Sequence, residues 1–343
     1  MFICPHVHLR DFKEDYKETI AHGLHVAERA GFTAVIDMPN SNPEITDAYV
    51  ARARLERAKE ANSPVRYFMH ALLTKDPDQV KRAINAYRTI DEVVGFKLYA
   101  GHSVRNLGVV NPSDQEKIYQ TLTAEGYDGV LVVHCEKESF MTPTLWDSKN
   151  PITHAYARPW QAEVRSLEDQ LAFATTYKFP GTLHVAHVSV PETVELLHAQ
   201  KEVKTTCGVT PHHLLLDYFA LEKNGGIIMK MNPPLRPPGM NVQLLQLLRQ
   251  RKITWVETDH APHDLYEKLN APHCSGITSI QKYPKFVRWL STQGLNEQHI
   301  RDITFNNINR TYALELEPRT CTPALDLEKE YPFDPYQPFG LLP

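Results

Sequence analysis

Two histidines, His6 and His8, end the short apolar segment that opens the chain, and Arg10 follows two residues later. In an extended strand, residues separated by two point to the same side. The two imidazoles can therefore reach one metal ion, and the guanidinium of Arg10 offers a fork of donors that fits a carboxylate. A His-x-His motif alone is not specific, so satisfied core or surface histidines and an ordinary surface ion pair of Arg10 are the alternatives.

Other polar residues that could bind a metal or a substrate stand at the ends of later apolar segments: Asn40, Lys97, His134, His187 and Asp259. Together with His6 and His8, they belong to six different segments. If those segments are strands of one parallel sheet, their carboxyl ends meet at one edge. The sequence therefore predicts a metal site at that edge.

The segments that must position these residues have the pattern of buried parallel strands. Eight short runs rich in Val, Ile and Phe precede or include residue 260, namely ICPHVHL, FTAVIDMPN, VRYFMHALL, VVGFKLYA, GVLVVHCE, TLHVAHVS, VKTTCGVT and KITWVETDHAPH. Stretches of helical period lie between them, at 45–62, 77–89 and 113–125. Apolar strands separated by helices indicate a parallel sheet buried on both faces.

Eight such strands are the number that closes a TIM (β/α)8 barrel, an α/β fold whose active sites lie where the strands end. An open doubly wound sheet is the competing architecture, but the Gly-x-Gly-x-x-Gly turn of its nucleotide-binding form is missing. We expect residues 1–317 to form a single catalytic barrel domain. We expect the proline-rich tail, 318–343, to pack on the barrel or on a neighbouring subunit.

Lys97 is unusual in a ring of metal ligands, because an ammonium group is repelled by divalent cations. A neutral lysine amine can add carbon dioxide to give a carbamate, whose two oxygens can bridge two metal ions. The alternative is a lysine that extends its charge to the mouth of the barrel. With four histidines and an aspartate around it, we favour the carbamate (N6-carboxylysine).

Several other features have ordinary explanations. His184 and His187 are an odd number of residues apart, so alternation predicts that only one faces the barrel interior, and we select His187. His212 and His260 are expected to orient ligands or cap loops. The segment 100–108 could fold over a bound substrate or be a static connector.

Composition gives no sign of a nucleic-acid or membrane partner. The formal net charge is −4, no apolar stretch has the length of a membrane span, and the start MFICPHVHLR lacks the pattern of a signal peptide. The five cysteines are scattered without a C-x-x-C pair, which argues against a disulfide framework and a zinc knuckle. We therefore expect a cytoplasmic protein with structural cysteines.

The motifs HVHLR, MPNSNP, FKLYA, HCE, HVAHVS, NPPLR and TDHAPH together resemble those of the dihydroorotases, which belong to the metal-dependent amidohydrolase superfamily. The resemblance spans residues 6 to about 276. It implies that His6, His8 and Asp259 bind one metal ion and that His134 and His187 bind a second, with carboxylated Lys97 between them. Zinc is the first expectation for such ligands, although manganese, cobalt or iron would also fit.

The resemblance further implies the reaction and the substrate contacts. A hydroxide shared between the two ions would open the ring of dihydroorotate to N-carbamoyl-aspartate, reversibly, as a step of pyrimidine biosynthesis, and Asp259 would transfer the proton. Arg10, Asn40 and His263 would bind the substrate carboxylate, and Asn232 and Ser275 would contact the ring. A homodimer is expected from the resemblance and from the frequency of symmetric assemblies.

Two other functions remain open at this point. A hydantoinase or allantoinase would use the same metal ligands on other cyclic amides, but those relatives generally lack an arginine at the position of Arg10. A metal-free barrel that serves only as a scaffold for aspartate transcarbamoylase would have lost metal ligands. None of the expected ligands is missing from this sequence.

Overall fold

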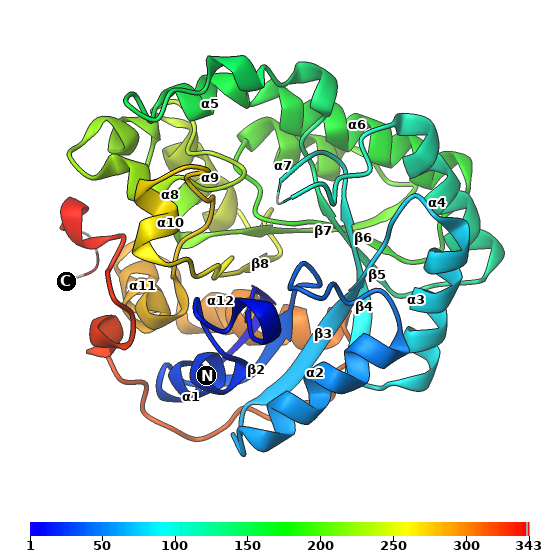
Figure 1. The fold of residues 1–343 in the computed structure, drawn as a ribbon, viewed down its shortest axis with the longest axis horizontal. Coiled ribbons are helices and arrows are strands. Elements are labelled where there is room, and N and C mark those ends of the chain that lie inside the picture. The colour runs from blue at the N-terminus through cyan, green and yellow to red at the C-terminus, as the bar shows by residue number, and fades with distance from the viewer. Residues whose placement is uncertain (104, 341, 343) are drawn as a thin grey trace.

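The computed structural model describes residues 1–103, 105–340 and 342. Its centre is a sheet of eight parallel strands in the order β1 to β8 (Figure 1). The strands are β1 Phe2–Val7, β2 Phe32–Asp37, β3 Arg66–Leu72, β4 Val93–Tyr99, β5 Val130–His134, β6 Thr182–Val185, β7 Lys204–Val209 and β8 Trp255–Val256. A parallel bridge between Val7 and His260 joins the two ends of the sheet, where the His8 amide donates to the carbonyl of His260 at 2.7 Å. The TIM-barrel prediction is confirmed.

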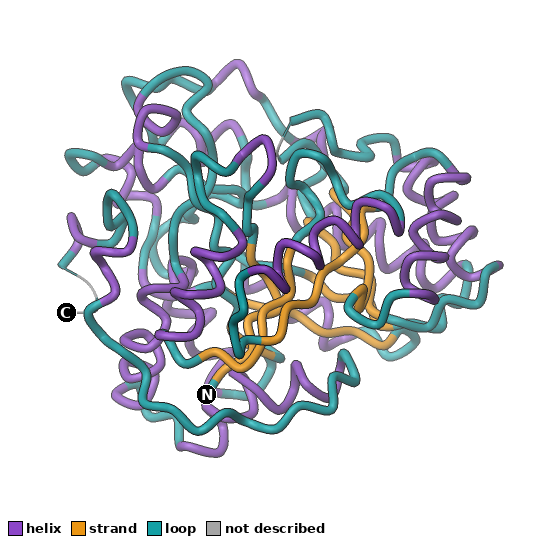
Figure 2. The backbone as a smooth tube through the Cα atoms, turned by 60° about the horizontal axis from the view of Figure 1, so that its bottom comes forward, coloured by secondary structure: helices purple, strands orange, loops and turns teal. Residues whose placement is uncertain are grey.

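Helices surround the strands, as the tube view in Figure 2 shows. They are α1 Ile20–Arg29, α2 Ala48–Glu60, α3 Pro77–Thr89, α4 Pro112–Ala124, α5 Thr153–Ala157, α6 Gln161–Thr176, α7 Pro191–Ala199, α8 Pro211–Leu215, α9 Met240–Arg249, α10 Leu265–Leu269, α11 Tyr283–Thr292, α12 Glu297–Arg301 and α13 Asn307–Thr311. Each of the eight segments expected to be strands matches one, and the expected helical stretches match α2, α3 and α4; β1 and α4 each begin one residue earlier than expected, at Phe2 and Pro112. No helix in the described residues is both long and apolar enough to span a bilayer.

The strands are buried on both faces because their side chains pack alternately inward and outward. In β2, Val35 belongs to the large cluster formed with the surrounding helices, whereas Ala34 and Ile36 pack inside the barrel. Trp255 and Ile308 belong to the same inner cluster. A strand that is buried on both faces needs apolar residues at successive positions, and the strand segments of this sequence have that pattern.

Local signals explain where the helices begin. Asp76 caps α3, accepting a hydrogen bond from the Asp78 amide, and Pro77 occupies its first turn. Asn111 caps α4 in the same way, and Pro112 opens that helix. A capping side chain followed by proline satisfies a free amide and presets the helical backbone.

The segment after Glu317 runs over the outside of the barrel, beside α1 (Figure 1). The Ala324 amide donates to the Arg29 carbonyl at 2.8 Å, and the buried Leu327 and Tyr331 join the large cluster. These contacts are with the chain's own barrel. The domain boundary at residue 317 stays a prediction, and residues 341 and 343 of the tail lie outside the described residues.

Candidate metal centre

One pocket at the carboxyl ends of the strands gathers most of the polar residues expected from the sequence. Its lining is His6, His8, Arg10, Asn40, Lys97, Tyr99, Ser103, His134, His187, Asn232, Asp259, Ala261, Ser275 and Gly276. All six residues expected to bind metal are among them, as are four of the five expected substrate contacts. The fifth, His263, lies next to the pocket, with Nε2 3.3 Å from a terminal nitrogen of Arg10.

His6, His8 and Asp259 form a compact group of potential ligands at this pocket. Asp259 Oδ1 lies 3.3 Å from His6 Nε2 and 3.0 Å from His8 Nε2. The other ring nitrogen of His8 lies 2.5 Å from Asn40 Oδ1, which can only accept a hydrogen bond. His8 Nδ1 therefore carries the proton, and the lone pair of Nε2 faces Asp259.

His134 and His187 form a second group. His134 Nδ1 and His187 Nε2 are 3.2 Å apart, and both side chains are buried. The opposite nitrogen of His134 lies 2.9 Å from a carboxylate oxygen of Glu136, to which it donates. The Nδ1 lone pair of His134 is thus directed towards His187. A histidine whose second nitrogen donates to a carboxylate is the arrangement that fixes a metal-binding tautomer.

Lys97 Nζ is fully buried and has no hydrogen-bond partner among the described residues. It lies 5.1 Å from the centre of the Tyr99 ring. Burial lowers its pKa from 10.5 to about 8, because desolvation disfavours the ammonium form. An unpartnered buried amine with a lowered pKa has the chemistry expected of a lysine that adds carbon dioxide.

The protonation states in the pocket are those that metal binding needs. Burial and the nearby Lys97 lower the pKa of His6 to about 4, so its imidazole is neutral at pH 7. Burial alone would raise the pKa of Asp259, but His8 and His6 outweigh it and the pKa falls below its usual value. Neutral imidazoles and an ionised carboxylate are the metal-binding forms.

The backbone that carries Arg10 is fixed by a buried ion pair. Arg54 of α2 and Asp37 at the end of β2 are fully buried and paired at 2.5 Å. Arg54 also donates to the carbonyls of Leu9 and Arg10, the latter at 3.0 Å, and Asp37 accepts from the Leu9 amide at 2.9 Å. Arg10 is thus presented by backbone that two other elements hold in place.

The side chain of Arg10 is 3% exposed and faces the pocket without a carboxylate partner among the described residues. Its Nε donates to the Pro262 carbonyl at 3.1 Å, which leaves the terminal nitrogens towards His263 and the pocket. A nearly buried guanidinium that contacts one carbonyl and one imidazole, and no carboxylate, is suited to an anionic ligand. The alternative reading of Arg10, an ordinary surface ion pair, does not hold among the described residues.

Asn232 and Ser275 also line the pocket. Asn232 Oδ1 lies 2.9 Å from His154 Nε2, and its Nδ2 donates to the Ser103 carbonyl at 2.9 Å. Arg105, two residues after Ser103, donates a hydrogen bond to the Ser41 carbonyl at 3.0 Å. The segment 100–108 therefore crosses between two walls of the pocket; Val104 within it lies outside the described residues.

Two buried glutamates that the sequence analysis did not select support the ligands from behind. Glu257 lies 3.3 Å from His6 Nδ1 and accepts from the His187 amide and from Trp255 Nε1. Glu136 holds His134 and is paired with Arg158. Both lie beyond the ends of their strands, β5 at His134 and β8 at Val256, so strand alternation gave no signal for either in the sequence.

The choice between His184 and His187 rested on an argument that is wrong in this structure. Both side chains face the barrel interior: His184 Nε2 lies 3.3 Å from Glu257, and His187 lines the pocket. Strand β6 ends at Val185, and His187 adopts a left-handed backbone with φ of 39°. Alternation holds only inside a strand, so counting residues past its end gives no orientation.

No protein-family model matches the chain. The dihydroorotase of Methanothermobacter thermautotrophicus is 31% identical over 300 residues, which are 85% of this chain and 64% of that protein. The dihydroorotase of Listeria welshimeri is 29% identical over an alignment of 365 positions, gaps included, that covers 97% of this chain and 79% of that protein. The chain spans about three fifths of the length of the first relatives it matches, between 59% and 64%.

Solved structures share the fold at lower identity. An L-hydantoinase from Arthrobacter aurescens has a TM-score of 0.78 and 21% identity, with 95% of this chain and 73% of that chain covered. A dihydroorotase from Campylobacter jejuni has a TM-score of 0.70 and 18% identity, with 92% and 84% covered. These structures support the barrel fold alone. The sequence relationships, joined to this fold, place the chain in the family of dihydroorotase-like amidohydrolases.

Proposed function

We propose that this chain is a dihydroorotase, which opens the ring of dihydroorotate to N-carbamoyl-aspartate and catalyses the reverse cyclisation. The observation that carries the proposal is Arg10, a nearly buried guanidinium that shares one pocket with His6, His8 and Asp259. Dihydroorotate carries a carboxylate beside its cyclic amide, whereas hydantoin and allantoin do not. The names of the relatives at about 30% identity support the same choice.

The residues of the pocket fit two divalent ions. His6, His8 and Asp259 would hold one ion, and His134 and His187 the other. Lys97, as its carbamate, would lie between them, and its unpartnered buried Nζ supports that assignment. When bound, the ions would activate a water molecule for attack and polarise the carbonyl under attack. Zinc remains the first candidate for these ligands.

Asp259 is the residue proposed to move the proton. Its Oδ1 contacts both His6 and His8, which leaves Oδ2 to accept the proton of the attacking water. As the water oxygen bonds to the carbonyl carbon, the ring carbon–nitrogen bond breaks and Asp259 returns the proton to the leaving nitrogen. In cyclisation the same carboxylate takes the proton from that nitrogen.

Arg10 is proposed to bind the substrate carboxylate, with His263 and Asn40 beside it. Burial lowers the pKa of His263 to about 3 although Glu267 lies 3.1 Å from its Nδ1. Asn40 holds His8 through its oxygen, and its Nδ2 has no partner among the described residues, so that amide remains available to the substrate. Asn232 and Ser275 would contact the ring.

The experiment is a substrate comparison on purified full-length chain, with metal content measured in parallel. Dihydroorotate, hydantoin and allantoin are supplied to protein as isolated, after chelation and after zinc is restored. We expect ring opening of dihydroorotate only, lost with chelation and regained with zinc. Faster turnover of hydantoin or allantoin would assign a different cyclic amidohydrolase. A chain that binds no metal and is inactive on all three substrates would favour the scaffold function. Light scattering tests the expected homodimer separately.

A further inference from the structure

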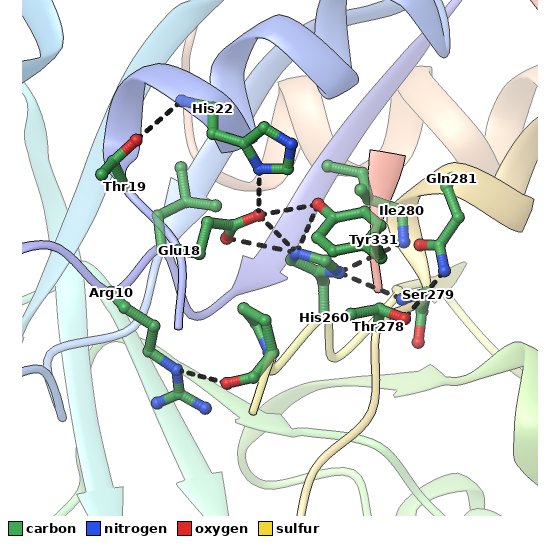
Figure 3. A network of polar contacts seen from close by, with 12 residues as sticks. Arg10, Glu18, Thr19, His22, His260, Thr278, Ser279, Ile280, Gln281 and Tyr331 are labelled. Atoms are coloured by element: carbon green, nitrogen blue, oxygen red, sulfur yellow. Dashed lines mark hydrogen bonds and ion pairs between the residues drawn. The ribbon is translucent and has the colours of Figure 1, made fainter. Parts of the chain in front are cut away.

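The tail of the chain reaches a buried polar cluster that lies behind the proposed site. Tyr331, 7% exposed, donates from Oη to Glu18 Oε1 at 2.7 Å and lies 3.0 Å from His260 Nε2 (Figure 3). Glu18 precedes α1, and His260 follows Asp259 directly. Three segments far apart in the sequence therefore meet at one buried carboxylate.

The proton positions in this cluster follow from the fixed donors. The Ser279 amide can only donate, and it lies 3.0 Å from His260 Nδ1, which must therefore accept. In the neutral imidazole the proton is then on Nε2, which faces both oxygens of Glu18 at 3.3 Å. The hydroxyl of Tyr331 and Nε2 of His260 are thus two donors that converge on Glu18.

Glu18 receives enough donors to stay ionised although it is buried. Its Oε1 also lies 3.2 Å from His22 Nδ1. Burial alone would raise its pKa, but His260, His22 and Tyr331 outweigh it and lower the pKa to about 2. Removal of one of these donors should lower the stability of the folded chain, because the buried charge of Glu18 would then lack a hydrogen-bond partner.

The backbone of the cluster leads directly to two residues of the site. The Glu18 carbonyl accepts from the Asp11 amide at 2.9 Å, next to Arg10. The His260 carbonyl accepts from the His8 amide at 2.7 Å, next to Asp259. The backbone at Glu18 and His260 is therefore bonded directly to the segments that present Arg10 and His8.

We propose that Tyr331 is a positioning residue of the site: through Glu18 and His260 it holds the segments that carry Arg10 and Asp259. The tail is then a functional part of the barrel in addition to a cover for its outer surface. The positional role follows from the contacts themselves, and only its effect on turnover rests on the proposed function.

Hydrogen exchange followed by mass spectrometry tests the positional role without any assay of activity. Tyr331→Phe removes the hydroxyl and keeps the ring in the core. We expect amides in 8–18 and 257–264 to exchange about tenfold faster, with those in β3 to β5 unchanged. Tyr119→Phe is the matched control, because Tyr119 is also buried and donates to Gln170 Oε1 at 2.9 Å on another side of the barrel.

A second variant separates the proposed connection from simple loosening of the tail. Glu18→Gln should give the same exchange pattern, and Tyr331→Phe should add little in the double variant, because both changes break one cluster. Faster exchange confined to residues 319–336, or additive effects in the double variant, would overturn the proposal. If the unaltered chain turns over dihydroorotate, Tyr331→Phe should also raise its KM about tenfold; an inactive chain would refute the proposed function alone.

Discussion

Glu257→Gln is the substitution that examines the metal centre most directly. Each oxygen of Glu257 serves two neighbours: Oε1 faces His6 Nδ1 and the His187 amide, and Oε2 faces His184 Nε2 and Trp255 Nε1. Glutamine has nearly the same shape but only one acceptor oxygen. Two of the four contacts must therefore meet an amide NH2 group, which donates.

The magnitude follows from what Glu257 does for His6. Glu257 Oε1 lies 3.3 Å from His6 Nδ1, and a carboxylate beside that nitrogen favours the tautomer in which Nε2 binds metal and makes the imidazole a better ligand. Loss of such a partner lowers metal affinity about 10- to 100-fold. That range corresponds to about 1.4 to 2.7 kcal/mol of binding free energy.

The assay is a competition titration of metal-free protein with zinc and a chromophoric chelator. Glu163→Gln is the matched control, because Glu163 is equally buried but is held by Ser189 and Thr193, neither of which is a candidate ligand. We expect Glu257→Gln to weaken the zinc bound by His6 and His8 and the control to retain the affinity of the unaltered chain. A folded Glu257→Gln protein with unchanged zinc affinity would refute the account of His6 given above.

Three further predictions concern the carboxylate contact, the lysine and the tail cluster. Arg10→Lys replaces a fork of donors by a single ammonium group. Steady-state kinetics should therefore give a KM for dihydroorotate about 10- to 100-fold higher, with a smaller change in kcat. An unchanged KM would show that Arg10 does not bind the substrate. Lys97→Ala removes the group proposed to bridge the ions, so elemental analysis should find fewer than two metal ions per chain, and two tightly bound ions would contradict the carbamate. The pKa of Glu18 is lowered from 4.5 to about 2 in the folded chain. The contribution of its carboxylate to the free energy of unfolding is therefore complete above pH 4.5 and lost as the pH falls towards 2. Urea unfolding of Glu18→Gln should depend less on pH in that interval, and the same pH dependence as in the unaltered chain would be evidence against the ionised cluster.

The barrel could be predicted from the sequence because its signal is local. Each strand is a short apolar run, and each of α3 and α4 begins at a capping residue followed by proline. Such features depend on neighbours a few residues away. The number of strands then decided the architecture, since eight parallel strands close a barrel.

The candidate ligands could be predicted for the same reason, because the ends of parallel strands meet at one rim. The supporting residues could not. Glu257 acts through His6, and Tyr331 acts through Glu18, across separations of about 250 and 310 residues in the chain. A glutamate near a strand end or a tyrosine in a proline-rich tail carries no local mark of such a partner. The alternation argument that turned His184 away from the interior is wrong for a related reason, because the left-handed backbone of His187 lies in the turn that follows β6.

The bridge between Val7 and His260, which joins the first strand to the last, has a consequence for synthesis of the protein. His8 and Asp259 stand on opposite sides of this seam, so the three-residue ligand group is absent from any nascent chain that has not yet emerged past residue 259. Metal that binds there stabilises only the completed barrel and none of its N-terminal precursors. Loading of an ion held by His6, His8 and Asp259 would therefore follow translation of residue 259, and depletion of the metal should leave chains that extend past this residue as apoprotein.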